Sequence, residues 1–133
     1  MKVLTLREPF ATLIKNKKKY IETRSWKTNY RGELYIHASI SKIGKSIDGR
    51  VELIKLINNA EMSYGYILCK CDLVDCIEMT EEYIEKIKKE EPEQYICGEY
   101  SVGRYAWILK NIKLLDKPIP AKGQLGIWNY KVE

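Results

Sequence analysis

The chain has 133 residues, of which 45% are hydrophobic and 31% are charged, so it is neither disordered nor fibrous and can bury its own core. No apolar run reaches the roughly 18 residues of a membrane helix, and the opening MKVLTLREPF lacks a signal-peptide pattern. We therefore expect one cytoplasmic domain over residues 1–133. The net charge of +5 favours an anionic partner such as nucleic acid.

A strand and a short helix are predicted first. Residues 1–7 alternate as a strand does, and Pro9 suits the first turn of the following helix PFATLIKNK. The lysine run 15–19 places positive charge at the negative end of the helix dipole. The inner face of this helix is expected to carry Phe10, Leu13 and Ile14.

The next stretch, KYIETRSWKTNYRG at residues 19–32, combines cationic and aromatic side chains with a single carboxylate, Glu22. A strand over residues 20–26 would place Glu22 with Arg24 and Trp26 on one face, and Ile21 on the other. A carboxylate beside an arginine and an indole can hydrogen-bond a polar heterocycle and stack on it. The alternative is a structural ion pair of Glu22 and Arg24 on a solvated strand.

Lys19 and Glu22 can act together only if their side chains converge. They lie on opposite faces of an ideal strand, so the strand must begin after Lys19 or contain a bulge. We predict convergence with Arg24 as a third member, because buried charges are less costly as a hydrogen-bonded set. Burial and Glu22 would shift the Lys19 pKa in opposite directions, which leaves the sign open. We also expect Lys19→Ala to remove function without unfolding the domain.

The middle of the chain predicts a strand over residues 32–39 and a helix over VELIKLINNA, residues 51–60. The longest alternating run, residues 65–79, predicts a central strand. Thr80 is expected to cap a helix that ends before Pro92. The buried stripe of the helix at 51–60 is predicted to contain Ile47, Val51, Ile54 and Ile57 or Asn58.

Two further strands are predicted in residues 104–115 and 124–132, joined by the turn KPIPAKG, and they are interpreted as antiparallel neighbours. Trp107 and Trp128 lie in these apolar strands and are expected in the core, whereas Trp26 precedes a polar loop and is expected to be partly exposed. The fold class is therefore α+β. Five to six strands with two to four short helices favour a mixed, partly closed β-barrel over a doubly wound sheet.

Neither a metal nor a cofactor is expected. The four cysteines contain no C-x-x-C pair, which argues against a zinc ribbon and favours small buried hydrophobic residues of a reducing compartment. His37 is the single histidine. It is expected on the strand face opposite the apolar one, in a hydrogen-bonding or structural role.

Four segments together resemble the ASCH domain (activating signal cointegrator homology) of the PUA-like superfamily, over nearly the whole chain. The G-x-K-x-x-E-x-R box of the family has Lys17 in place of its glycine, whereas Lys19, Glu22 and Arg24 match. The resemblance implies a six-stranded barrel with a cleft lined by this box. The segments are LTLREPFATLIKNKKKYIETRSW, YRGELYIHAS, GYILCKCDLVDC and GRYAWILKNIKLLDKPIPAKGQLGIWNY.

PUA-like domains generally bind RNA or modified bases, so the resemblance implies that the partner is RNA, other single-stranded nucleic acid or a nucleoside-like molecule. We expect it in a basic, aromatic cleft. The expected contact residues are Lys19, Glu22, Arg24, Ser25, Trp26, Lys27, Tyr30 and Arg31.

The alternative implied by the resemblance is a hydrolase that uses Lys19 and Glu22, either a ribonuclease or an amidohydrolase of a modified nucleoside such as acetylcytidine. The hydrolase relatives use a lysine, a threonine and a glutamate. Lys19 matches the lysine, but Glu22 stands at the threonine position and the glutamate position falls near Cys71. A replacement nucleophile would be Cys71 activated by Lys19.

Overall fold

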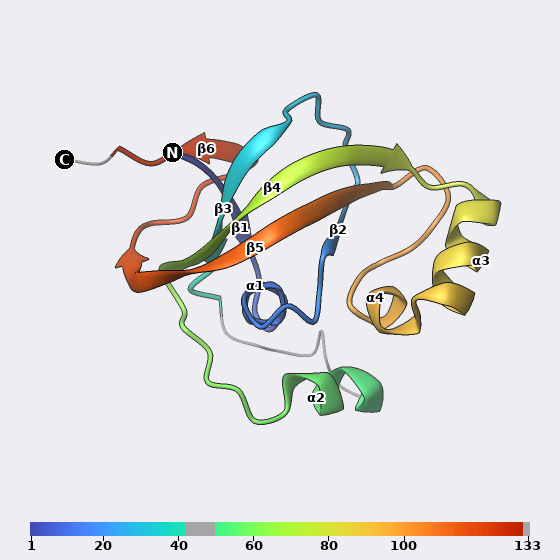
Figure 1. Cartoon of the computed structure of the whole chain (residues 1–133), viewed down its shortest axis with the longest axis horizontal. Coiled ribbons are helices and arrows are strands. Elements are labelled where there is room, and N and C mark those ends of the chain that lie inside the picture. Colours follow the sequence, from blue (N-terminus) through green and yellow to red (C-terminus); the bar gives the residue numbers. More distant parts are fainter. Residues whose placement is uncertain (42–49, 132–133) are drawn as a thin grey trace.

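A curved six-stranded sheet with four helices makes up the part of the chain that our computed structural model describes, residues 1–41 and 50–131 (Figure 1). This is the predicted α+β, partly closed barrel. The elements are β1 (Lys2–Leu6), α1 (Phe10–Lys15), β2 (Ile21–Arg24), β3 (Gly32–Ala38), α2 (Val51–Ile57), β4 (Tyr66–Glu78), α3 (Glu81–Glu90), α4 (Pro92–Ile96), β5 (Tyr105–Pro120) and β6 (Ile127–Asn129).

The strand order is β2-β5-β4-β3-β1-β6, with β1 and β3 parallel and the other pairs antiparallel. The prediction that the last two strands are neighbours is wrong, because β6 pairs with β1. The predicted turn is also wrong in its first half, since β5 continues to Pro120. Pro118 and Pro120 are tolerated there because β2 pairs only with Tyr105–Ile108. Beyond Ile108, the side of β5 that faces away from β4 is an open edge, and an open edge needs no N–H donors.

The main core lies between the hollow of the sheet and α1, which contacts β1, β3, β4 and β5 (Figure 1). On α1, Leu13 and Ile14 are buried as predicted, whereas Phe10 is half-buried. Trp107 and Trp128 are buried, which confirms their expected place in the core. The alternating apolar residues of the strands therefore face α1 as the period of two requires.

The predicted buried stripe of α2 is wrong. Val51 and Ile54 are 55% and 50% exposed, and Ile47 lies outside the described residues. Leu53 is buried instead, in a cluster with Leu13. Both stripes of this short helix are apolar at helical spacing, so the packing against α1 decides which one is buried.

The helices α3 and α4 follow the central strand and lie beside the end of the sheet that contains β2 (Figure 1). The Thr80 hydroxyl accepts a hydrogen bond from the Tyr83 amide, which confirms the predicted cap. The sequence pattern does not predict α4, which begins at Pro92. From α4 the buried Gln94 accepts from the Tyr20 and Ile21 amides, so this helix holds the entry to β2 in place.

His37 is fully buried, although it lies on the opposite side of β3 from the main core. Its ring nitrogens lie 3.2 Å from the Thr5 hydroxyl and 2.7 Å from the Ala121 carbonyl, which confirms a hydrogen-bonding role. None of the helices in the described part of the chain has the length and apolar character needed to cross a bilayer.

Candidate functional site

Lys17 follows α1 in a left-handed conformation, with φ of 63°, at the turn of the chain toward β2. The amides of Lys18 and Lys19 then both donate to the Leu13 carbonyl. A left-handed residue is most easily a glycine, because a Cβ is strained there. This conformation gives a physical reason for the glycine that is usual in the family box at this position.

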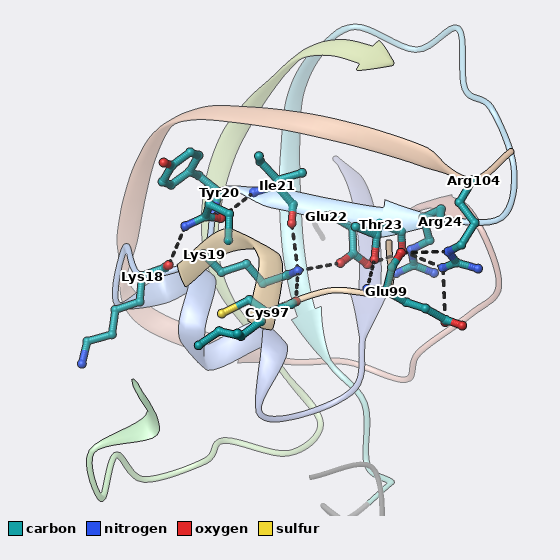
Figure 2. A network of polar contacts seen from close by, with 12 residues as sticks. Lys18, Lys19, Tyr20, Ile21, Glu22, Thr23, Arg24, Cys97, Glu99 and Arg104 are labelled. Carbon is teal, nitrogen blue, oxygen red and sulfur yellow. Dashed lines mark hydrogen bonds and ion pairs between the residues drawn. The ribbon is translucent and has the colours of Figure 1, made fainter. Parts of the chain in front are cut away.

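The Lys19 side chain is 1% exposed and points toward Glu22 and the Cys97 carbonyl (Figure 2). Its ammonium donates to the Ile21 carbonyl at 2.8 Å and to the Cys97 carbonyl, and lies 3.4 Å from Glu22 Oε1. The ammonium thus has two hydrogen bonds to carbonyls and one ion pair with a carboxylate. The expectation that Lys19→Ala leaves the fold intact therefore loses its basis, because this lysine supports buried backbone.

Glu22 links Lys19 to Arg24, whose Nε donates to Glu22 Oε2 at 2.8 Å. Arg24 Nη2 also donates to the Thr5 carbonyl at 2.9 Å, so the set is tied to β1. The predicted convergence is confirmed, and its cause is that β2 begins at Ile21, after Lys19. We call these three side chains the charged set.

Burial lowers the pKa of Lys19 from its ordinary value of 10.5, although Glu22 and Cys97 raise it. Desolvation thus outweighs the carboxylate, which decides the sign that the sequence leaves open. Glu22 is 7% exposed and lies between two cations. The arrangement is a buried carboxylate held in one orientation.

A cleft of about 670 Å³ opens beside the charged set. Four of the expected contact residues line it: Glu22, Arg24, Ser25 and Trp26. The Trp26 side chain is 37% exposed, as predicted, and its ring meets Trp107 edge-on at 4.7 Å between centroids. Trp26 is therefore partly exposed at the cleft and packs against the buried Trp107 ring.

Four expected contact residues do not line this cleft: Lys19, which is buried, and Lys27, Tyr30 and Arg31. Lys27 is exposed, and the Tyr30 hydroxyl donates to the Glu33 carbonyl. Arg31 donates to the Tyr30 carbonyl and lies 3.9 Å from Asp75. Lys27, Tyr30 and Arg31 belong to the loop between β2 and β3, which leaves the cleft after Trp26.

The far wall of the cleft comes from a segment that sequence reasoning missed, residues 97–104. Arg104 donates to the Thr23 and Glu99 carbonyls and lies 3.7 Å from the Glu99 carboxylate (Figure 2). Gly98 allows close approach, because a Cβ there would lie 2.8 Å from Thr23 Cγ2. The other lining residues that were missed are Thr5, Leu6, Arg7, Phe10, Thr23, Arg50, Cys97, Gly98 and Glu99.

Cys71 lies in the main core rather than in the cleft lining. Its thiol is directed at the Leu34 carbonyl at 3.5 Å, and burial raises the pKa of the thiol well above its ordinary value. A protonated, buried thiol is a poor nucleophile. Across residues 1–41 and 50–131, no three His, Cys, Asp or Glu side chains are grouped so that they could hold a metal.

A curled six-stranded half-barrel with a helix in its hollow is a PUA-like fold. Within this class the chain belongs to the ASCH domain family, whose sequence profile matches residues 4–119. It is similar to activating signal cointegrator 1 of Homo sapiens, with 26% identity over 132 residues, and to that of Mus musculus, with 25%. Each alignment covers 94% of this chain but 21% of the relative, so the chain spans about a fifth of their length.

Proposed function

We propose that this ASCH domain binds RNA or a nucleotide-like ligand in the cleft beside the charged set. The observation that carries the proposal is the partly exposed Trp26 ring at a cleft whose lining contains four arginines. Aromatic stacking combined with nearby cations is how many proteins hold single-stranded nucleic acid. The cleft volume, about 670 Å³, lies in the range of small-molecule sites.

In this proposal Glu22 recognises a donor on the ligand. Each carboxylate oxygen has two lone pairs, so both retain an acceptor position after the contacts with Lys19 and Arg24. Because these two cations already fix the carboxylate, a ligand would lose little free energy in ordering it. Ser25 is exposed at the same rim and would supply a hydroxyl.

A longer single strand would leave the cleft past Trp26 and follow the next loop. There we assign Lys27 and Arg31 to phosphate contacts and Tyr30 to an adjoining aromatic surface. Lys27 and Arg31 are both exposed, which suits contacts with a flexible backbone. These roles belong to oligonucleotides rather than to a single nucleotide.

The second candidate function is hydrolysis of RNA or of a modified nucleoside such as acetylcytidine. The lowered pKa of Lys19 favours it, since a general base needs a neutral amine near neutral pH. Against it, Lys19 does not line the cleft, and its ammonium is held by two carbonyls and the Glu22 carboxylate. The nearby thiol of Cys97 is protonated because burial raises its pKa. Binding without turnover is therefore the better-supported function.

The test compares binding of short single-stranded RNAs and of nucleotides to the wild type and to Trp26→Ala. We expect the variant to lose about 1–3 kcal/mol of binding free energy, which is roughly 5- to 150-fold in affinity. Tyr66→Ala is the matched control, because Tyr66 is 41% exposed and lies outside the cleft lining. A wild type that binds none of these ligands would rule out the proposal.

A turnover assay separates binding from hydrolysis. Acetylcytidine and RNA are incubated with the wild type and with Glu22→Gln, and the products are measured by chromatography. Turnover that disappears in Glu22→Gln would establish the hydrolase. Binding with no turnover in the wild type would establish the binding module.

A further inference from the structure

Among the described residues, two glutamates line the cleft, and they differ in how firmly they are held. The Glu99 side chain is 77% exposed, and its carboxylate lies 3.7 Å from Arg104. Glu22 is 7% exposed, and Lys19 and Arg24 contact different oxygens of its carboxylate, at 3.4 and 2.8 Å. Glu22 therefore offers an oriented carboxylate to a ligand, whereas the Glu99 carboxylate is largely hydrated.

Glu22 and Trp26 are linked through Trp107. In the antiparallel pair of β2 and β5, Glu22 lies directly opposite Trp107, and the Cβ atoms of such opposed residues are about 4.5–5.5 Å apart. The Trp107 ring meets the Trp26 ring edge-on at 4.7 Å between centroids, and its Nε1 donates to the Trp26 carbonyl at 3.4 Å. The fixed carboxylate and the partly exposed indole are therefore neighbours in the cleft lining.

A carboxylate that is paired with cations accepts hydrogen bonds and donates none, so it selects a ligand by its donors. An unpaired base presents its Watson–Crick edge to a protein. Guanine has two adjacent donors on this edge, N1–H and the N2 amino group. Cytosine and adenine have one amino group beside an acceptor, and uracil has one N–H between two acceptors. The two donors of guanine form the same fork as in arginine, which pairs with a carboxylate through two parallel hydrogen bonds.

We infer that Glu22 accepts from N1–H and the N2 amino group of a guanine ring that stacks on Trp26, so that the cleft selects guanine. The inference rests on the proposed function and names the ligand as a guanine nucleoside or nucleotide, or an unpaired guanine of RNA. Each Glu22 oxygen has two lone pairs and one contact with a cation, which leaves a position for one donor. The other bases would place an acceptor opposite one of these oxygens, and two facing acceptors disfavour binding.

The test measures the affinity of the full wild-type chain for guanosine, inosine and 1-methylguanosine by isothermal titration calorimetry. Inosine differs from guanosine only in lacking the N2 amino group, and 1-methylguanosine lacks the N1–H donor. Both keep the purine ring that stacks, so the comparison reports the hydrogen bonds to Glu22. We expect each to bind about tenfold more weakly than guanosine, or more, and adenosine, cytidine and uridine to be weaker as well.

The same comparison in RNA identifies the source of the guanine. Short uridine RNAs that carry one guanine or one hypoxanthine are measured beside guanosine 5′-monophosphate. Tighter binding of the guanine-bearing RNA than of the monophosphate identifies RNA as the ligand, and the reverse order identifies a free nucleotide. In both cases the guanine form should bind tighter than the hypoxanthine form.

Glu22→Gln should remove most of the preference for guanosine over inosine, because the amide replaces one of the two acceptors by a donor. Glu8→Gln is the matched control and should keep the preference. Glu8 is also a buried glutamate, accepts from the Thr12 amide at 2.8 Å and lies outside the cleft lining. Thermal melting confirms that each variant is folded. If Glu22→Gln does not fold, the ligand series with the wild type decides alone.

Three results would overturn the inference: equal affinity for the guanine and hypoxanthine forms, tighter binding of another base, or a folded Glu22→Gln variant with the full preference. Each of these leaves the proposed function standing, because the cleft would still bind nucleosides or RNA. A wild type that binds no nucleoside, nucleotide or RNA would overturn the proposed function, and the selection of guanine with it.

Discussion

Two neighbouring regions of one basic segment have opposite physical environments. In β2 and just before it, Lys19 and Glu22 are 1% and 7% exposed and form an ion pair, and Lys19 also donates to the Ile21 carbonyl. In the loop that follows, Lys27 and Arg31 are exposed, and the contact of Arg31 with Asp75 spans 3.9 Å in solvent. Charge density in the sequence therefore does not indicate which charges the fold depends on.

The largest difference should appear on removing one cation from each region. Lys19→Ala removes the ammonium that pairs with Glu22 and donates to two buried carbonyls, so we expect it to lower the free energy of unfolding by about 3–5 kcal/mol. Lys27→Ala should change it by no more than about 0.5 kcal/mol. Urea denaturation followed by tryptophan fluorescence measures both. Equal stability of the two variants would contradict the expected difference between the buried Lys19 and the exposed Lys27.

The buried region should also give a distinct pH dependence. Because the folded pKa of Lys19 lies below 10.5, the unfolded chain binds more protons between these two values, and stability should rise with pH through that window. Each unit of pKa shift corresponds to about 1.4 kcal/mol.

Tyrosines with a raised pKa make stability fall as pH rises, since the folded chain then binds more protons. Burial raises the pKa of Tyr20 in this way, to about 12. The measurement is therefore the difference between wild type and Lys19→Met, unfolded by urea from pH 7 to 10.5. A difference that does not change with pH would show that Lys19 keeps its ordinary pKa.

The exposed region should affect RNA binding and not stability. Replacing Lys27 and Arg31 together by glutamine should weaken binding of a single-stranded oligonucleotide by roughly 1 kcal/mol at low salt. It should also flatten the plot of log affinity against log salt by about 0.7 for each phosphate that the variant no longer neutralises. An unchanged slope would place the backbone of the RNA elsewhere on the domain.

The smallest effect is expected at the junction of α1 with β2. Lys17→Gly removes the steric strain of a left-handed lysine and should raise the free energy of unfolding by about 0.5–1 kcal/mol. Lys15→Gly, inside α1, should lower it by a similar amount. Destabilisation by both would mean that chain flexibility, rather than strain, dominates at Lys17.

The convergence of the charged set could be predicted because it depends on local geometry. Alternation places Glu22 and Arg24 on one face of the strand, and the cost of burying separate charges predicts that Lys19 joins them, without knowledge of the fold. The partly exposed Trp26 follows in the same way from the polar loop after it. Local patterns were thus sufficient for the charged set and for Trp26.

The walls could not be predicted, because they depend on contacts between distant segments. Nothing near Arg50 or Arg104 in the sequence indicates that they meet Phe10 and Thr23. The same limit explains two errors in the fold. The buried face of α2 and the partner of β6 are both chosen by tertiary packing between alternatives that are locally similar.

The hydrogen bond from Lys19 to the Cys97 carbonyl has a consequence for the order of folding. It joins residues 78 positions apart, and the cleft needs Glu99 and Arg104 as well. A chain emerging from the ribosome therefore cannot complete the cleft until residues 97–104 are available, and this non-local closure makes the binding site a late event. Ligand binding during synthesis would consequently report that the chain extends beyond Arg104, and a ligand present at that moment would stabilise only chains that contain this segment.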